Sequence, residues 1–183
     1  MPSVLVPLAQ GCEEVEAVTI IDLLRRAGIK VISAGLDDKP VVASRGVRLV
    51  PDITLDTALQ SDFDMVVLPG GGAGADNLGK DSRIADLLKK MANSGKFTGA
   101  ICAAPKVLAA AGLLNDRQAT AFPGTLDGLN IPGMKLKTDA VVIDGRIITS
   151  RGPGTAMDFA LAIIEQLSGK PVRDKVEAGL ARN

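Results

Sequence analysis

Short apolar runs alternate with amphipathic stretches along almost the whole chain. Four runs bounded by turn residues predict buried strands, at residues 4–6, 31–32, 64–68 and 97–102. Apolar positions at helical spacing predict helices between and after them; these positions are Ala17, Ile20, Ile21 and Leu24, then Ile84, Leu87, Leu88 and Met91, and finally Met157, Leu161, Ile164 and Leu167. Residues 141–143 and 147–148 predict a hairpin that turns at Asp144-Gly145.

Unbroken apolar strands separated by helices indicate a parallel sheet that is covered on both faces. The chain has 183 residues, the size of one ordinary domain, and it contains no internal repeat, low-complexity tract or long linker. We therefore expect residues 1–183 to form a single α/β domain, with a doubly wound, mostly parallel sheet sandwiched by helices. Ligands of such folds bind outside the carboxyl ends of the strands. Three loops of unusual composition fall there, at residues 10–16, 69–77 and 100–105.

Composition narrows the possible functions. Lys and Arg number 21, Asp and Glu also number 21, and the chain has four Phe but no His, Trp or Tyr. Balanced charge and few aromatic residues argue against nucleic-acid binding. Without His, neither Ser-His nor Cys-His catalysis nor a histidine-containing zinc site is possible within the chain, and two cysteines cannot form a disulfide framework. No apolar run approaches the ~18 residues of a membrane helix. We expect a cytoplasmic protein with no metal, cofactor, membrane or nucleic-acid partner.

Cys102 is the first candidate for chemistry. It ends a predicted strand and precedes Pro105, which suits the first turn of a helix. The small residues Ala100 and Ala104 flank it at the positions where a tight nucleophile elbow needs small side chains. Because a helix N-terminus favours a thiolate, this placement predicts a reactive cysteine with a lowered pKa. The alternative is a small, buried hydrophobic residue.

Three acidic residues, Glu13, Glu14 and Glu16, lie in the turn after the first strand. The helix dipole favours acidic side chains in a first helical turn, which is a sufficient structural explanation for all three. The turn nevertheless opens at the same sheet edge as Cys102. A carboxyl group beside a thiolate is the best candidate for general acid/base chemistry in a chain without histidine. The pattern of residues leaves open which of the three would act.

The glycine-rich segment from Pro69 to Ala75 allows three interpretations. Its backbone N–H groups could form an oxyanion hole next to Cys102, or it could be a tight turn with positive φ. It also matches the dinucleotide fingerprint, but no acidic residue for a ribose follows about 20 residues on, so we rank cofactor binding lowest. Residues 150–155 and Arg45 are open to an anion-binding or a structural role, and we expect Cys12 to be a packed small residue.

Four motifs in order resemble the ThiJ/PfpI family, closest to its Parkinsonism-associated deglycase branch. They are GCEEVEA at residues 11–17, VLPGG at 67–71, AICAAP at 100–105 and TSRGPGT at 149–155. The resemblance covers essentially the full length, with similar spacing throughout. It implies a flavodoxin-like homodimer with an oxidation-sensitive cysteine.

The resemblance also implies roles for particular residues. The family's nucleophile falls on Cys102, and its protonated glutamate partner falls on Glu16. The backbone N–H groups of Gly71 and Ala103 correspond to the oxyanion hole. Further matching positions lie near the pocket and the dimer contact; they are Arg45, Phe122, Arg151, Gly152 and Pro153. Phe122 stands where some members have a histidine, so the Cys-His proteolysis of the protease branch is not expected.

The leading hypothesis is an enzyme that acts on reactive dicarbonyls. The Cys102 thiolate would attack the aldehyde of methylglyoxal or glyoxal, and Glu16 would move protons while a 2-hydroxy acid forms without glutathione. Glycated protein side chains would be alternative substrates. A second hypothesis is a redox-sensing or chaperone-like protein that uses oxidation of Cys102. A third, a nucleotide- or flavin-binding module, rests on fold analogy alone.

Overall fold

A seven-stranded sheet organises the computed structural model, which describes residues 1–182. Its strand order is β10-β11-β7-β6-β1-β2-β5, and every neighbouring pair is parallel except β10 with β11. The strands are β1 (Ser3–Leu8), β2 (Lys30–Gly35), β5 (Ile53–Thr54), β6 (Met65–Leu68), β7 (Phe97–Ile101), β10 (Val141–Asp144) and β11 (Ile147–Ser150). Two short ladders stand apart from this sheet: β3 (Val41–Val42) with β4 (Arg48–Leu49), and β8 (Gln118–Ala119) with β9 (Lys135–Leu136).

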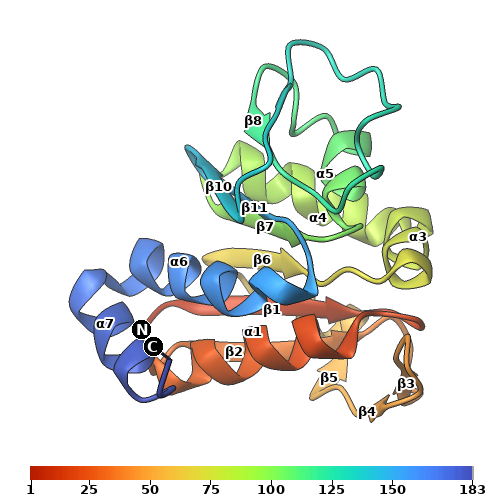
Figure 1. Ribbon diagram of the computed structural model, residues 1–183. Helices are drawn as coiled ribbons and strands as arrows, with labels where there is room; N and C mark the ends of the chain where they lie inside the picture. Colours follow the sequence, from red (N-terminus) through yellow and green to blue (C-terminus); the bar gives the residue numbers. More distant parts are fainter. Residues whose placement is uncertain (183) are drawn as a thin grey trace.

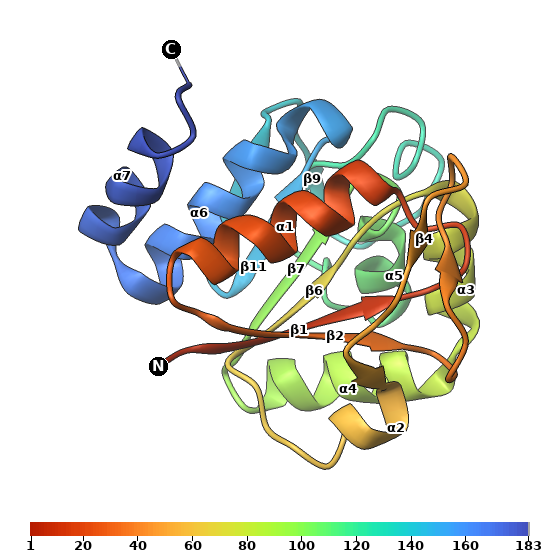
Figure 2. The same ribbon diagram turned by 90° about the horizontal axis from the view of Figure 1, so that it is seen from below.

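Helices cover both faces of the sheet (Figures 1 and 2). On one face lie α1 (Glu14–Arg26) and α6 (Ala156–Ser168), with α7 (Lys170–Ala178) packed against α6. The other face carries α2 (Leu55–Ala58), α3 (Gly72–Lys80), α4 (Ser82–Asn93) and α5 (Pro105–Ala110). A short 3₁₀ turn, Pro153–Thr155, leads into α6. This is the predicted doubly wound α/β architecture.

The alternation of side chains along β1 divides the core in two. Val4, Val6 and Leu8 pack with the apolar residues of α1 and α6, whereas Leu5 packs with those of α2 to α5. Successive side chains of a strand point to opposite faces, so a strand that is buried on both faces is apolar throughout. The hairpin predicted at Asp144-Gly145 is also confirmed, since β10 and β11 are antiparallel partners around it.

Three expectations need correction. The predicted stripe of α6 includes Met157, but this side chain is 43% exposed, and the buried face is instead formed around Phe159 and Ile163. The glycine-rich loop is shorter than predicted, because α3 already begins at Gly72. The polar helix α7 and the β3–β4 hairpin were not predicted, since neither contains a long periodic run of apolar residues.

The order of the strands creates the crevice where function is expected. The chain leaves β1 to form β2 on one side and later returns to form β6 on the other side of β1. Connections therefore diverge at the carboxyl ends of β1 and β6, which is the topological switch point of the fold. Within residues 1–182, no helix is both long and apolar enough to cross a membrane.

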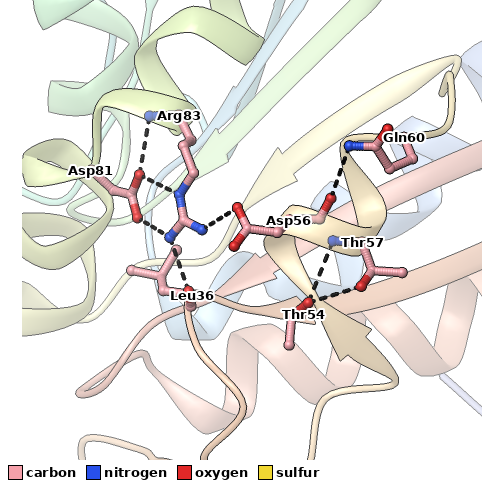
Figure 3. A network of polar contacts seen from close by, with 7 residues as sticks. All are labelled: Leu36, Thr54, Asp56, Thr57, Gln60, Asp81 and Arg83. Atoms are coloured by element: carbon pink, nitrogen blue, oxygen red, sulfur yellow. Dashed lines mark hydrogen bonds and ion pairs between the residues drawn. The ribbon is translucent and has the colours of Figure 1, made fainter.

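Hydrogen bonds of Arg83 link the start of α4 to α2 and to the segment after β2 (Figure 3). Its guanidinium donates to both carboxylate oxygens of Asp81, at 3.0 and 2.6 Å. It also donates to Asp56 of α2 at 2.7 Å and to the carbonyl oxygen of Leu36 after β2 at 2.9 Å. A planar guanidinium has enough donors, in the right directions, for all of these acceptors. An ammonium group cannot make the same set of hydrogen bonds.

We predict that Arg83→Lys lowers the free energy of unfolding by about 1–2 kcal/mol, because the variant loses charge-assisted hydrogen bonds to partly buried acceptors. Urea unfolding followed by circular dichroism measures the change. Lys90→Gln is the control, since its ion pair with Asp62 is largely exposed, with side chains 60% and 85% accessible, and should contribute less than about 0.5 kcal/mol. Equal effects of the two substitutions would contradict a structural role of the Arg83 network.

Candidate functional site

Cys102 occupies a strained turn between β7 and α5. It is one of three residues other than glycine with positive φ in the described part of the chain, at 62°. Its N–H donates to Ser150 O at 3.0 Å, and its carbonyl oxygen accepts from Phe122 N at 2.9 Å. Backbone strain of this kind costs about 1–3 kcal/mol and persists only where the surroundings impose it. The elbow predicted from the small flanking residues is thus present, and Cys102 is 9% exposed.

Glu16 is the acidic residue that the fold places beside this cysteine. It lies in the first turn of α1 and is fully buried. Its Oε2 accepts a hydrogen bond from Gly70 N at 2.8 Å, and its Oε1 has no hydrogen-bond partner among residues 1–182. Glu13 and Glu14 turn away from the sulfur and contact Ser44 instead. The structure therefore separates three acids that the sequence pattern left equivalent.

Gly70 provides the space in which the carboxyl and the thiol meet. A Cβ atom at this position would lie 2.6 Å from Cys102 Cβ and 2.7 Å from Glu16 Oε2. Such distances are far below van der Waals contact, so any side chain here would push the two groups apart. Gly70 belongs to the glycine-rich segment, but its contact with Glu16 was not predicted, because sequence spacing does not show which glycine faces α1.

Two backbone donors face the sulfur of Cys102. The N–H groups of Gly71 and Ala103 interact with it and lower its pKa, each as a hydrogen-bond donor. Gly71 has a φ of 85°, and a Cβ there would meet Gly11 O and Glu13 N within 2.7 Å. Gly71 therefore combines a tight turn with positive φ and an N–H that faces the sulfur.

Burial controls the proton affinity of the pair. Burial raises the pKa of Glu16 to about 7. Hydrogen bonds from Gly70 and Cys102 lower this pKa but are outweighed, and the negative charge of Glu13 adds to the increase. Burial is also the main reason that the pKa of the Cys102 thiol is raised to about 11, and the negative charge of Glu16 is the second reason. The expected lowering of the thiol pKa is therefore wrong in its net direction, because desolvation outweighs the backbone donors.

The remaining predicted residues lie at different distances from the sulfur. Phe122 is half-exposed and bonded through its backbone to Cys102, and its ring lies against Gly152, where an added Cβ would be 3.3 Å away. Arg151 directs its guanidinium to Thr138 O at 3.0 Å, and Pro153 is exposed. Arg45 is exposed on the β3–β4 hairpin, and its backbone N–H donates to Glu14. Phe122 and Gly152 are thus grouped around the elbow, whereas the Arg151 guanidinium is bonded to Thr138 and Arg45 is exposed on the hairpin.

Cys12 is fully buried in the core next to Gly74, where an added Cβ would lie 2.5 Å from Cys12 Cα. Both cysteines are free. Burial raises the pKa of the Cys12 thiol to about 11, and the charge of Glu14 adds to this increase. The packed, unreactive small residue expected at this position agrees with these surroundings. Across residues 1–182, no group of three or more potential metal-ligating side chains comes together.

The fold and the site define a class of protein. It is a flavodoxin-like α/β protein with a cysteine on a strand-to-helix elbow, a buried carboxyl group beside the thiol and backbone donors around the sulfur. The model of the DJ-1/PfpI family matches residues 2–166, and the chain belongs to this family.

Individual relatives support this membership. Protein dj-1beta of Drosophila melanogaster is 45% identical over 179 residues, which cover 97% of this chain and 96% of that protein. Its crystal structure matches with a TM-score of 0.95 at 44% identity and covers 100% of this chain and 98% of that one. Protein DJ-1 homolog B of Arabidopsis thaliana is 47% identical over 171 residues; these are 92% of this chain but 39% of the plant protein. The glutathione-independent glyoxalase DJR-1.2 of Caenorhabditis elegans is 41% identical over 160 residues, covering 87% of this chain and 85% of that protein.

We predict that Gly70→Ala separates Cys102 from Glu16 and destabilises the fold by about 1–3 kcal/mol, because the added methyl group overpacks the site. Thermal unfolding and the rate of Cys102 alkylation measure the two effects. Gly72→Ala is a matched control two residues away, where nothing lies within 4 Å of an added Cβ. The predicted clearance role of Gly70 is wrong if both variants behave like the wild type.

A second prediction concerns stability and pH. The pKa of Glu16 is raised from near 4.5 to about 7, so the protonated carboxyl contributes stability below about pH 4.5 that is lost as the pH rises through 7. Glu16→Gln removes this loss, and relative to the variant the wild type should lose on the order of 3 kcal/mol over this interval. Urea unfolding at a series of pH values measures it. Glu165→Gln on α6 should follow the wild-type curve, and a parallel curve for Glu16→Gln would contradict a buried, titrating Glu16.

Proposed function

We propose that the protein is a cysteine-dependent enzyme that converts reactive dicarbonyls into 2-hydroxy acids without glutathione. The observation that carries this proposal is the placement of a fully buried carboxyl, Glu16, and the elbow cysteine, Cys102, on either side of the space that Gly70 leaves free. The name of the related nematode protein, a glutathione-independent glyoxalase, supports the reaction class. Glycated protein side chains are a second class of substrate for the same nucleophile.

The proton shared by Cys102 and Glu16 explains how a buried thiol with a raised pKa can act as a nucleophile. Two coupled groups lose their protons in steps that belong to the pair. Between about pH 7 and about pH 11 the pair retains one proton. Transfer of this proton from the thiol to the carboxyl gives a thiolate next to a carboxylic acid, and the N–H groups of Gly71 and Ala103 stabilise the negative sulfur.

The proposed reaction has three steps: addition, rearrangement and hydrolysis. The thiolate adds to the aldehyde carbon of methylglyoxal, and Glu16 donates its proton to the new oxygen, giving a hemithioacetal. Glu16, now a carboxylate, removes the proton from this carbon and returns it to the neighbouring carbon, while the hydroxyl proton of the hemithioacetal moves to the former ketone oxygen. The former ketone thereby becomes an alcohol and the former aldehyde becomes a thioester. Water hydrolyses the thioester, which releases lactate and restores the Cys102 thiol.

Exposed apolar side chains support a homodimer as the assembled form. Val15 and Val18 are 52% and 48% exposed on α1, although this helix has a well-buried opposite face. Met157 lies at the start of the neighbouring α6, and Val47, before β4, is also exposed while its backbone N–H donates to Glu14 in the first turn of α1. Clustered apolar surface of this kind is typical of protein–protein contacts.

The first test is the formation of lactate from methylglyoxal without glutathione. We expect turnover by the wild type and a loss of at least about 100-fold in Cys102→Ala, because the variant lacks the nucleophile. Glu16→Gln should lose activity to a similar degree, since an amide cannot take up and return a proton. Cys12→Ala is the control and should retain activity.

Equal or negligible rates of lactate formation in the wild type and Cys102→Ala would disprove the proposal. Redox sensing through Cys102 would then be the better hypothesis, and mass spectrometry after peroxide treatment would show whether a sulfinate forms. Undiminished turnover in Glu16→Gln alone would leave the nucleophile in place but disprove the proton-transfer role of Glu16.

A further inference from the structure

The β3–β4 hairpin lies beside the turn that leads into α1 (Figure 2). Two backbone hydrogen bonds join the hairpin to this turn. Gly11 N donates to Val42 O at 2.8 Å, and Ser44 N donates to Cys12 O at 2.8 Å. These two hydrogen bonds join the hairpin to the residues immediately before the acidic turn. The position of the hairpin and the position of the first turn of α1 therefore depend on each other.

The hydroxyl of Ser44 lies between two carboxylates. Its Oγ is 2.7 Å from Glu13 Oε2 and 2.9 Å from Glu14 Oε2. The second oxygen of Glu14 accepts from Arg45 N at 2.8 Å. Burial raises the pKa of Glu14, but hydrogen bonds from its own N–H, from Ser44 and from Arg45 and Val47 outweigh this and leave the pKa below its usual value. Glu14 is therefore a carboxylate that the hairpin holds in place.

Glu13 is the member of this cluster that is linked to Gly70 and whose charge acts on Glu16. Its N–H donates to Gly70 O at 3.0 Å, while Gly70 N donates to Glu16 at 2.8 Å. The negative charge of its half-buried side chain raises the pKa of Glu16. The Ser44 hydroxyl is the one side-chain hydrogen-bond partner of the Glu13 carboxylate within residues 1–182.

We propose that Ser44 is a positioning residue whose hydroxyl holds the Glu13 carboxylate against the α1 turn that carries Glu16. Without the hydroxyl, the Glu13 side chain is free to turn into solvent, where its charge is screened. The Cys102–Glu16 pair then releases its first proton more readily, because less negative charge opposes the loss. Ser44 touches neither sulfur nor substrate and acts only through Glu13.

Few other groups are placed to influence this titration. The titratable side chains that face Glu16 are Glu13 on its own helix turn, Cys12 before α1 and Cys102 on the β7–α5 turn. The hairpin contributes the neutral Ser44 and the exposed Arg45. A change at Ser44 should therefore reach the pair mainly through Glu13.

The test measures the rate at which iodoacetamide alkylates Cys102 as a function of pH, with the modified peptide quantified by mass spectrometry. Only a thiolate is alkylated. When the pair loses its first proton, near pH 7 in the wild type, the remaining proton can move from the thiol to the carboxyl and leave a thiolate, so the alkylation rate rises there. We expect Ser44→Ala and Glu13→Gln to shift this rise to lower pH by roughly 0.5 unit, the effect of one nearby charge that is partly screened. Ser44→Thr keeps the hydroxyl and should restore the wild-type profile.

Each outcome decides the proposal. An unshifted profile in Ser44→Ala overturns it, as does an unshifted profile in Glu13→Gln, which also covers the case in which Ser44→Ala does not fold. An equal shift in Ser44→Ala and Ser44→Thr shows that shape matters and the hydroxyl does not, which again overturns it. The catalytic meaning of this role rests on the proposed function, but alkylation needs no substrate. Absent methylglyoxal turnover together with the expected shifts would therefore reject the enzyme and retain Ser44.

Discussion

The burial of one carboxyl group, that of Glu16, is the constraint on which the rest of the site depends. A buried carboxyl is costly when ionised and unpaired, so it either keeps a proton or needs donors around it. Here Gly70 supplies one donor to Oε2, at 2.8 Å, while Oε1 has no hydrogen-bond partner among the described residues, and burial raises the pKa of the carboxyl to about 7. The absence of a side chain at Gly70, the strained φ of Cys102 and the fastening of the α1 turn all serve to bring this carboxyl to the sulfur and keep water away from it.

The strain at Cys102 is held by the sheet. Its N–H is bonded to Ser150 at the end of β11, and its carbonyl is bonded to Phe122, so strand order and elbow geometry are coupled. Only a sheet in which β11 lies directly beside β7 offers the Ser150 acceptor at this place. The antiparallel β10–β11 hairpin at the sheet edge therefore contributes to the site without supplying a side chain to it, because it determines where β11 ends.

The fold was largely predictable because its signals are local. Apolar runs indicated the long parallel strands, and the small residues at positions 100 and 104 indicated the elbow. The choice among Glu13, Glu14 and Glu16 was not predictable from their pattern alone, since all three suit a first helical turn and only the packing of α1 on the sheet decides which one is buried; resemblance to the family pointed to Glu16. The direction of the Cys102 pKa shift was missed for a related reason: the helix N-terminus is visible in the sequence, whereas desolvation is not. Ser44 escaped attention because the pairing of the hairpin with the acidic turn is a long-range contact between polar residues.

The balance of charge around the sulfur bears on what the site can bind. Two neutral backbone donors and the Glu16 carboxyl lie beside Cys102, while Glu13 and Glu14 add further acidic groups on the α1 side. The guanidinium of Arg151 donates to Thr138 O, and Arg45 is exposed on the β3–β4 hairpin. An uncharged carbonyl compound would therefore meet no repulsion on entry, whereas a carboxylate would meet the acidic side chains of the α1 turn. In the proposed reaction this asymmetry favours release of the product, since the substrate is neutral and the 2-hydroxy acid is an anion. The same acidic surroundings that hold a proton on the Cys102–Glu16 pair would thus also help to clear the site after each turnover.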